Sequence, residues 1–560
     1  MAEKAEGMTQ PATIDWHTPG ELEARDRAYL RAFELVVDVQ CGVVGAAEEI
    51  ERLLAEARQH AWPEVVRAAM FAALSAAGNL GYVHRRAAMA RLLARSEEDD
   101  APIMTALALA VRAGLDISKA TPELAMTSDD DLARATVMLE GAEGPLMERI
   151  SAHNQCAQAY GARWLWELCD EQYATALKLA PVPPSAWGKF VFPAIVYNRA
   201  EMQVNWACVH RQVGEHQLLA ERWRTWETVM SSSGVEGMPR AWALELDALG
   251  LVLSALVGDD VAEQAKEMVP RVQREQHPGA WPVGWLHLAV ALSDQRAGRL
   301  EGARRAVELA VTEIDHVGSS DPFDLALFVA AELEAGGRQS AGLRYARREL
   351  DERWSRRLAW HSSMVGRIQA ERLRREHDFV TQQAHLDDLT PLLNRRGFSR
   401  YLDSLALQDG GQVSLLVADL DNFKSVNDRY GHQVGDTVLV SIGRMLHGHV
   451  RQSDCAVRLG GDEFALVLAS AGAGVARRRA EALIAAVREQ PWEELAPGLA
   501  ITISVGLASG WSTDLSSLIE RADRALYEAK RNGRDRVVFD DTPTVGPDPL
   551  EGDFALSDPS

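Results

Sequence analysis

Residues 456–469 read AVRLGGDEFALVLA, two short apolar runs separated by two glycines and two adjacent carboxylates. The Val, Leu, Phe and Ala residues on either side favour two strands, and Gly460 and Gly461 suit the turn between them. A turn does not require Asp462 and Glu463 side by side, because like charges one residue apart repel each other. The stretch therefore predicts a β-hairpin whose tip binds a positively charged group.

Strands and helices alternate around this hairpin from residue 387 onward. The run VSLLVADLDNF (413–423) predicts a buried strand that ends in Asp419, Leu420 and Asp421, with both carboxylates on one side of the chain. LAITISVGLA (499–508) predicts a further buried strand. Carboxylates at neighbouring strand ends favour a hard divalent cation such as Mg²⁺. The pattern predicts an α/β domain suited to phosphoryl or nucleotidyl transfer.

Two cations follow near the end of this domain. RALYEAKRNGRDRV places Lys530 and Arg534 four residues apart, either on one helix face or at the last turn before Gly533. Cations also commonly decorate the C-terminus of a helix. In a domain with paired carboxylates, these two suit the terminal phosphates of a triphosphate.

Composition limits the compartment and the partners. The 560 residues carry a formal net charge of −22 at pH 7, which argues against a nucleic-acid binder with a broad basic face. Five cysteines show no paired spacing, as expected in a reducing compartment. The first residues lack an apolar signal core, and no stretch approaches the roughly 20 apolar residues of a membrane span. We expect a cytoplasmic protein of several domains.

Residues 21–340 are rich in Ala, Leu, Glu and Arg at helical spacing and predict an all-α region. Four glycine positions punctuate it at separations of 44, 40 and 38 or 39 residues: Gly214, Gly258, Gly298 and the Gly336-Gly337 pair. Such intervals favour repeated helix pairs stacked as an α-solenoid. The stretch YGARWLWELCDEQYATALKLAP (160–181) resembles a tetratricopeptide unit, although the period here is longer than is usual for that repeat.

Residues 341–386 predict a long, charged connector helix. Its apolar residues recur loosely at sevens and fours, which favours a dimerising coiled coil over a single capping helix with a solvated face. Residues 1–20 and the acidic stretch 542–560 predict disordered tails.

Three separated motifs resemble those of the GGDEF-domain diguanylate cyclases. They are GGDEF (460–464), the opening motif DDLTPLLNRRGF (387–398) with Pro391 where glycine is more usual, and DLDNFKSVNDRYGHQVGD (419–436). The resemblance covers about residues 387–541 and implies a nucleotidyl-cyclase-like α+β domain with a mostly antiparallel sheet. Motifs spaced so widely make the resemblance specific.

The resemblance also implies a role for each matched residue. Two Mg²⁺ ions, or Mn²⁺, would be held with each GTP, and glycines at the turn would let the backbone approach the phosphates. Glu463 would contact metal or accept the proton of the attacking hydroxyl. An acid at position 436 favours guanine over adenine, because guanine presents two adjacent donors. The metal ligands would be Asp419, the Leu420 carbonyl, Asp462 and Glu463; the turn glycines Gly460 and Gly461; the guanine ligands Asn427 and Asp436; and the other GTP-binding residues Phe423, Lys424, Lys530 and Arg534.

The implied reaction condenses two GTP molecules into cyclic di-GMP and releases two pyrophosphates. Each domain would bind one GTP, so a homodimer is required. Arg451 and Asp454 form an R-x-x-D pair, and five residues separate Asp454 from Gly460, which is the register of the family's product-inhibition site. A generic R-x-x-D is often only a surface ion pair.

Two other functions compete with an active cyclase. One is a silent cyclic di-GMP receptor or scaffold that acts through the helical repeats, but every matched signature position is filled. The other is a bifunctional enzyme, which is disfavoured because no E-A-L or H-D-G-Y-P motif is present. In the favoured reading, a protein or small-molecule partner of the helical region regulates the cyclase.

Overall fold

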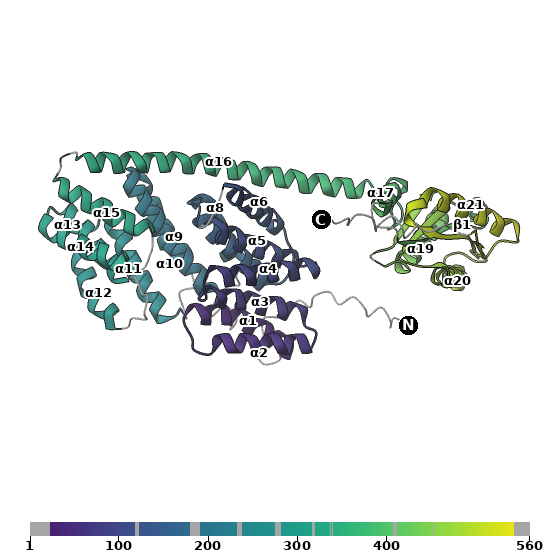
Figure 1. Cartoon of the computed structure of the whole chain (residues 1–560), viewed down its shortest axis with the longest axis horizontal. Helices are drawn as coiled ribbons and strands as arrows, with labels where there is room; N and C mark the ends of the chain where they lie inside the picture. The colour runs from purple at the N-terminus through teal and green to yellow at the C-terminus, as the bar shows by residue number, and fades with distance from the viewer. Residues whose placement is uncertain are drawn as a thin grey trace, which may run out of the picture. The chain divides into compact units, whose positions relative to one another are not determined.

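The structure is a computed structural model that describes residues 23–117, 122–179, 191–231, 238–274, 282–315, 320–336, 338, 340–406, 411–451 and 453–542. The N-terminal tail predicted at 1–20, and the C-terminal one beyond residue 542, lie outside the described residues. The chain divides into two compact units, residues 1–372 and 373–560. Each unit is described by itself below (Figure 1).

Helices make up all the regular structure that the described residues of the first unit contain, as predicted. Their apolar faces share one core, to which Phe33, Leu107 and Tyr160 contribute fully buried side chains. The helices are α1 (Ala24–Gln40), α2 (Ala46–Gln59), α3 (Pro63–Gly78), α4 (Tyr82–Glu98), α5 (Pro102–Ile117), α6 (Pro122–Leu139), α7 (Leu146–Gly161), α8 (Trp166–Leu179), α9 (Val191–Val213), η1 (His216–Leu218), α10 (Leu219–Met230), α11 (Arg240–Val257), α12 (Ala262–Arg274), α13 (Pro282–Arg296), α14 (Leu300–Asp315), α15 (Ser320–Ala335) and the first part of α16 (Ala341–Gln383).

Glycines end the helices where the sequence predicts. Gly214, Gly258, Gly298 and Gly336 follow α9, α11, α13 and α15 with φ between 53° and 132°, values that favour glycine. The chain then reverses, and α9 packs on α10, α11 on α12 and α13 on α14. These helix pairs confirm a helical region, whereas tetratricopeptide-like repeats specifically stay a prediction.

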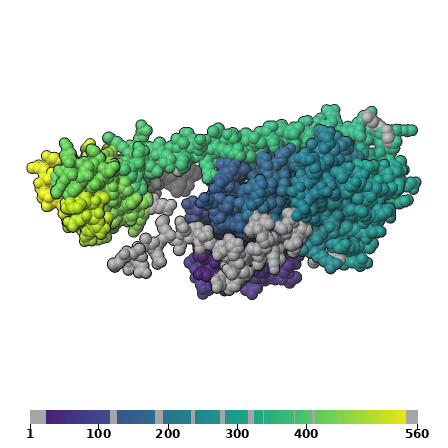
Figure 2. Space-filling model, turned by 180° about the vertical axis from the view of Figure 1, so that it is seen from behind, coloured from purple at the N-terminus to yellow at the C-terminus, as the bar shows by residue number. Residues whose placement is uncertain are grey.

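The helix α16 occupies most of the predicted connector and is one uninterrupted helix (Figure 1). Figure 2 shows it lying along the surface of the first unit's helices. Leu343 and Leu350 pack with Phe328 of α15, and Ile368 belongs to the main core. These three apolar positions of the expected coiled-coil pattern are therefore buried within the chain, because α16 closes over the helical core. Others of the pattern are exposed: Leu358, Val365, Leu373 and Val380.

The second unit contains a five-stranded sheet in the order β2-β3-β1-β4-β5. Three neighbouring pairs are antiparallel, as predicted, and β4 pairs with β5 in parallel, so the sheet is mixed. The strands are β1 (Gln412–Leu420), β2 (Cys455–Gly460), β3 (Glu463–Ala469), β4 (Ile503–Trp511) and β5 (Val537–Asp540). The strand predicted at 499–508 thus begins four residues late.

Helices cover both faces of this sheet, because the central strands are almost continuously apolar and successive side chains point to opposite faces. Leu416 and Leu466 face a core shared with α19 (His432–Gly448) and α20 (Ala473–Glu489). Leu415 and Val467 face a second core shared with α17 (Arg395–Ala406) and α21 (Leu515–Arg531). Across both units, none of the helices described here is long and apolar enough to cross a membrane.

Candidate active site

The ends of β1 and β3 bring the predicted carboxylates to one edge of the sheet. Asp419 of β1 lies opposite Glu463 of β3, and the backbone N–H of Leu420 donates to the carbonyl of Asp462 at 3.2 Å. Asp419 is only 8% exposed. Its burial raises its pKa, the charges of Asp462 and Glu463 raise it further, and Lys530 opposes the rise. The edge is thus an environment that favours added positive charge.

Lys530 reaches this edge from α21, whereas Arg534 does not lie on the same helix face. The Lys530 Nζ lies 2.7 Å from Asp419 Oδ2. The helix ends at Arg531, and Arg534 follows in the left-handed conformation with φ 63°. Its backbone N–H donates to the carbonyl of Ala529 and so caps the helix. The sequence left two alternatives for Lys530 and Arg534, a shared helix face or the end of the helix near Gly533. The structure shows the second.

Asp421 serves a structural role and does not join the carboxylate edge. Its side chain accepts hydrogen bonds from the hydroxyls of Thr502 and Ser504, at 2.7 and 2.6 Å, and from the backbone N–H of Asp535 at 3.0 Å. The strand β1 ends at Leu420, so the side chain of Asp421 no longer follows the strand's alternation. Asp421 instead fastens the end of β1 to β4 and to the segment before β5.

The glycine turn is held by Arg458, a residue that the sequence analysis did not single out. Its Nε and Nη2 donate to the carbonyl of Gly461 at 3.0 and 2.8 Å, and its Nη1 lies 3.1 Å from the carboxylate of Asp387. Burial raises the pKa of Asp387, but hydrogen bonds from Thr390 and Arg458 outweigh it and hold the pKa below its ordinary value. The sequence signal for this ion pair was an arginine two residues before Gly460 together with the acidic start of the opening motif.

The predicted guanine ligands come from α18 and from the start of α19. A Cβ placed on Gly435 would lie 1.9 Å from the Oδ1 of Asn427, so that amide lies directly over Gly435, the residue before Asp436. Asn427 belongs to α18 (Phe423–Tyr430) and is half-buried, while Asp436 is exposed. Phe423 is 7% exposed and packs in the core, where its ring lies against Gly435.

Lys424 is exposed on α18, one residue after Phe423. It projects from the first turn of that helix, in the segment that follows β1. Among the residues that the structure describes, no partner fixes its ammonium group, so Lys424 as a phosphate ligand stays a prediction.

The carboxylate edge fits a metal that the substrate helps to bind. Among the described residues, no three His, Cys, Asp or Glu side chains converge as a complete metal site. Mg²⁺ is usually bound by one or two carboxylates together with phosphate oxygens and water. Asp419, with Asp462 and Glu463 beside it, supplies such an incomplete set of hard oxygen donors.

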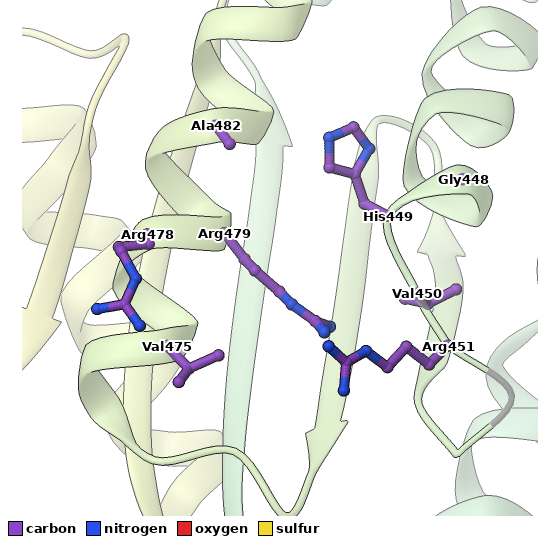
Figure 3. A pocket seen from close by; sticks show the side chains of 8 residues that line it. All are labelled: Gly448, His449, Val450, Arg451, Val475, Arg478, Arg479 and Ala482. Carbon is purple, nitrogen blue, oxygen red and sulfur yellow. The ribbon is translucent and has the colours of Figure 1, made fainter.

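A pocket of roughly 440 Å³ lies at the predicted product-inhibition pair. Figure 3 shows the guanidinium groups of Arg451 and Arg479 pointing toward each other across it, while Arg478 points away. Asp454 accepts hydrogen bonds from the backbone N–H of Arg451 at 3.1 Å and from Arg479 at 2.7 Å. The pocket is lined by Gly448, His449, Val450, Arg451, Val475, Arg478, Arg479 and Ala482.

Asp454 therefore fixes the backbone of Arg451 and the side chain of Arg479. The guanidinium groups of Arg451 and Arg479 give the pocket its positive charge. The sequence analysis missed Arg479. The run of three arginines at 477–479 was visible, but only the fold shows that α20 lies across from Arg451.

Comparison with known proteins finds similarity in the second unit. Residues 384–536 match the family model described as diguanylate cyclase, GGDEF domain. The diguanylate cyclase DgcP of Pseudomonas aeruginosa is 36% identical over 204 residues, which cover 34% of this chain and 30% of DgcP. The diguanylate cyclase VdcA of Vibrio cholerae is 37% identical over 175 residues, which cover 30% of this chain and 51% of VdcA. The chain thus spans about half or less of the length of these two relatives.

A solved structure of the coiled coil and GGDEF domain of DgcB from Caulobacter crescentus, in complex with c-di-GMP, is also similar. It shows 33% identity and a TM-score of 0.29, and the match covers 33% of this chain and 98% of that one.

Proposed function

We propose, from the GGDEF domain at residues 384–536, that this chain is a diguanylate cyclase that converts two GTP molecules into cyclic di-GMP and two pyrophosphates. The observation that carries the proposal is the edge of the sheet where Asp419 and Glu463 lie opposite each other and Lys530 reaches Asp419 at 2.7 Å. Carboxylates and a cation at one edge suit a metal-bound triphosphate. We expect the enzyme to act in the cytoplasm, where GTP is available.

Different residues would bind the metal, accept the proton and bind the phosphates. Bound Mg²⁺ supplies charge neutralisation of the triphosphate and polarisation of the α-phosphate. The carboxylates of Asp419 and Asp462, with the carbonyl of Leu420, would hold the metal. Glu463 would accept the proton of the attacking 3′-hydroxyl. Lys530 would donate to the terminal phosphates from its place beside Asp419.

Guanine recognition would rest on one side chain from α18 and one from the start of α19. The Asp436 carboxylate would accept from the N1–H and the exocyclic amine of guanine, and Asn427 would complete the recognition. Adenine presents no such pair of donors, so the exposed acid at this position selects GTP over ATP.

The reaction requires two copies of the chain, because one domain carries one such site. Exposed apolar side chains recur along α16 at intervals of seven or eight residues: Leu358, Val365, Leu373 and Val380. Such a stripe on a long helix suits contact with the same helix of a second copy. We place the dimer contact there, although other apolar positions of α16 are buried within the chain.

Regulation by the helical region is supported by the contacts of α16 with the helices before it. Trp360 donates its indole N–H to Asp129 at 2.8 Å, and Arg372 pairs with Glu140 at 2.7 Å. The same helix continues into the second unit, which begins at Leu373. A protein or small-molecule partner that changes these contacts would act on the helix that carries the dimer contact. Product inhibition would act through the pocket of Arg451 and Arg479.

The test is incubation of the purified full-length protein with GTP and Mg²⁺, with the product identified by chromatography. The control is the Asp462→Ala/Glu463→Ala double variant. Cyclic di-GMP from the native chain alone supports the cyclase. If neither protein forms product while the native chain still binds cyclic di-GMP, a silent receptor is the better description.

A further inference from the structure

Three consecutive residues after α21 adopt left-handed backbone conformations. Gly533, Arg534 and Asp535 have φ values of 109°, 63° and 51°. Glycine adopts such values readily, whereas an arginine or an aspartate keeps them only where the surrounding structure holds the backbone. Arg534 and Asp535 therefore lie in a strained turn, and contacts around that turn must maintain it.

Asp421 supplies a buried contact to this turn. Its Oδ2 accepts a hydrogen bond from the backbone N–H of Asp535 at 3.0 Å, which joins two residues 114 positions apart. Asp421 is only 8% exposed, so water competes little for its oxygens. The end of β1 thus supports the turn from the interior of the domain.

Two hydroxyl groups at the start of β4 orient the carboxylate of Asp421. Thr502 donates to Oδ2 at 2.7 Å and Ser504 donates to Oδ1 at 2.6 Å. Ser504 is fully buried and lies opposite Asp419 in the ladder between β1 and β4. The backbone N–H of Asp421 also donates to the carbonyl of Thr502 at 2.9 Å. The sheet therefore fixes the direction of the carboxylate that holds the turn.

A second side-chain contact reaches the turn from the solvent side. Arg488 of α20 pairs with the carboxylate of Asp535 at 2.7 Å, and the two side chains are 55% and 31% exposed. An exposed ion pair contributes little to holding a geometry, because water and salt screen it. The buried bond to Asp421 is thus the stronger support of the two.

The turn lies beside the carboxylate edge, because contacts before and after Arg534 anchor it there. Lys530 lies 2.7 Å from Asp419, and Asp535 is bonded to Asp421, two residues further along the chain from Asp419. Arg534 itself is exposed, and no hydrogen bond or ion pair with another described residue engages its guanidinium. That guanidinium is therefore available to a ligand at this edge.

We infer that Asp421 is a positioning residue, which holds the strained turn so that Arg534 meets the terminal phosphates of GTP. The inference rests on the proposed function, since it concerns how that site binds its substrate. Arg534 can bind phosphate through two N–H groups at once, but only from a defined position. A guanidinium on a loose turn would first have to be ordered, and this ordering costs affinity.

Hydrogen exchange tests whether Asp421 holds the turn, and it needs no nucleotide. Mass spectrometry of the full-length protein follows the fragment that contains Asp535. In Asp421→Leu, which lacks an acceptor, we expect this fragment to exchange at least tenfold faster than in the native protein. Asp421→Asn keeps one acceptor oxygen and should stay near the native rate, as should the control Arg488→Gln. Native exchange in Asp421→Leu overturns the inference.

A milder variant keeps the test decisive if Asp421→Leu does not fold. Thr502→Val removes one of the hydroxyls that orient the carboxylate and keeps the shape of the side chain. We expect it to speed the exchange of the same fragment about threefold. With Asp421→Leu unfolded, native exchange in Thr502→Val overturns the inference.

Calorimetric titration with a non-reactive GTP analogue and Mg²⁺ tests whether the turn acts through Arg534. Asp421→Leu, or Thr502→Val in its place, and Arg534→Met should each weaken the binding, the last by about tenfold or more. The double variant should bind no more weakly than Arg534→Met alone. A residue that only stabilises the fold would weaken the binding by the same factor in both backgrounds. Arg488→Gln should bind as the native protein does.

The outcomes separate this inference from the proposed function. If the native protein neither binds the analogue nor forms cyclic di-GMP, both are overturned. If the native protein binds the analogue but the effects of the Asp421 and Arg534 variants multiply in full, the inference alone is overturned. The proposed function then stands, and Asp421 supports the sheet without acting on Arg534.

Discussion

The ammonium nitrogen of Lys530 lies 2.7 Å from the carboxylate of Asp419, across the boundary between α21 and β1. This ion pair joins a residue proposed to bind metal to one proposed to bind phosphate. Asp419 is 12% exposed in its side chain and Lys530 is 33% exposed, so the lysine keeps access to solvent while the acid does not. Lys530 is therefore held at the place where the terminal phosphates would arrive.

The first prediction concerns this lysine. Lys530→Met should weaken the binding of Mg²⁺-GTP by about 10- to 100-fold, since a hydrogen bond to a charged group contributes about 1.5–3 kcal/mol. Calorimetric titration with a non-reactive GTP analogue measures the affinity. Arg531→Met is the matched control, because Arg531 is exposed and stacks on Tyr527 at 5.8 Å. Equal losses in both variants would contradict a specific role for Lys530.

The second prediction concerns Gly435. Gly435→Ala should raise the KM for GTP at least tenfold, because the new Cβ would lie 1.9 Å from Asn427 Oδ1 and displace that amide. Steady-state kinetics of cyclic di-GMP formation measure the change. Gly411→Ala, just before β1, should leave the KM as it is, since its Cβ would meet nothing within 4 Å. A native KM in the Gly435→Ala protein would show that Asn427 does not contact guanine.

The third prediction concerns the support of the glycine turn by Arg458. Arg458→Gln and Asp387→Asn should each lower kcat/KM, because the first removes the guanidinium that binds the carbonyl of Gly461 and the second removes the carboxylate that holds it. The double variant should lose less than the sum of the two. A double-mutant cycle on kcat/KM should return a coupling of about 0.5–3 kcal/mol. Strict additivity would show that Asp387 does not act through Arg458.

The fourth prediction concerns the pocket in Figure 3. Arg451→Ala and Arg479→Ala should each raise the concentration of cyclic di-GMP that halves the activity by about tenfold or more, because both guanidinium groups point into the pocket. Initial rates at increasing product concentration give this value. Arg477→Ala is the control, since Arg477 is exposed, does not line the pocket and pairs with Glu481. Unchanged inhibition in Arg451→Ala would remove the pocket as the inhibitory site.

The fifth prediction concerns pH and the helical unit. Burial raises the pKa of Glu148, a residue of α7 that is 3% exposed, from 4.5 to about 7, against the charge of Arg67. A raised pKa in the folded state stabilises the protein below the unfolded value, and this stability is lost as pH rises from about 4.5 through 7. Glu148→Gln should therefore unfold less readily than the native protein at pH 8, by up to about 3 kcal/mol.

Urea unfolding followed by circular dichroism at pH 5 and pH 8 measures this difference. The advantage of Glu148→Gln should shrink toward pH 5, where the native side chain is protonated. Glu143→Gln, on the exposed loop before α7, should behave as the native protein at both pH values. A pH-independent effect of Glu148→Gln would contradict the raised pKa.

The hairpin and its neighbouring strands could be predicted because their signals are local. Short, largely continuous apolar runs on either side of Gly460 and Gly461 specify two strands and a turn, and a similar run specifies β1. The pairing of Asp419 with Glu463 follows once those strands are adjacent. The resemblance to a known family supplied the mostly antiparallel character of the sheet, whereas the order of its strands came only from the structure.

Contacts between distant segments could not be predicted in the same way. Asp421 seemed equivalent to Asp419 because the two lie two residues apart, yet its partners come from residues 502–535. Arg458 looked like an ordinary strand residue, and its role depends on Asp387, 71 positions earlier. The apolar pattern of α16 likewise could not reveal whether its faces pack on a second chain or on the chain's own helices.

The order of the strands also determines when the sheet can form during synthesis. The central strand β1 emerges first, but its two neighbours are β3 and β4, and β4 ends at Trp511, some 90 residues after β1. A ribosome therefore exposes an apolar strand, Val413–Leu420, well before either neighbour exists to cover it. The nascent chain carries this strand without a neighbour until β3 is complete at Ala469, some 50 residues later, and the helical unit, complete by then, is free to fold beforehand.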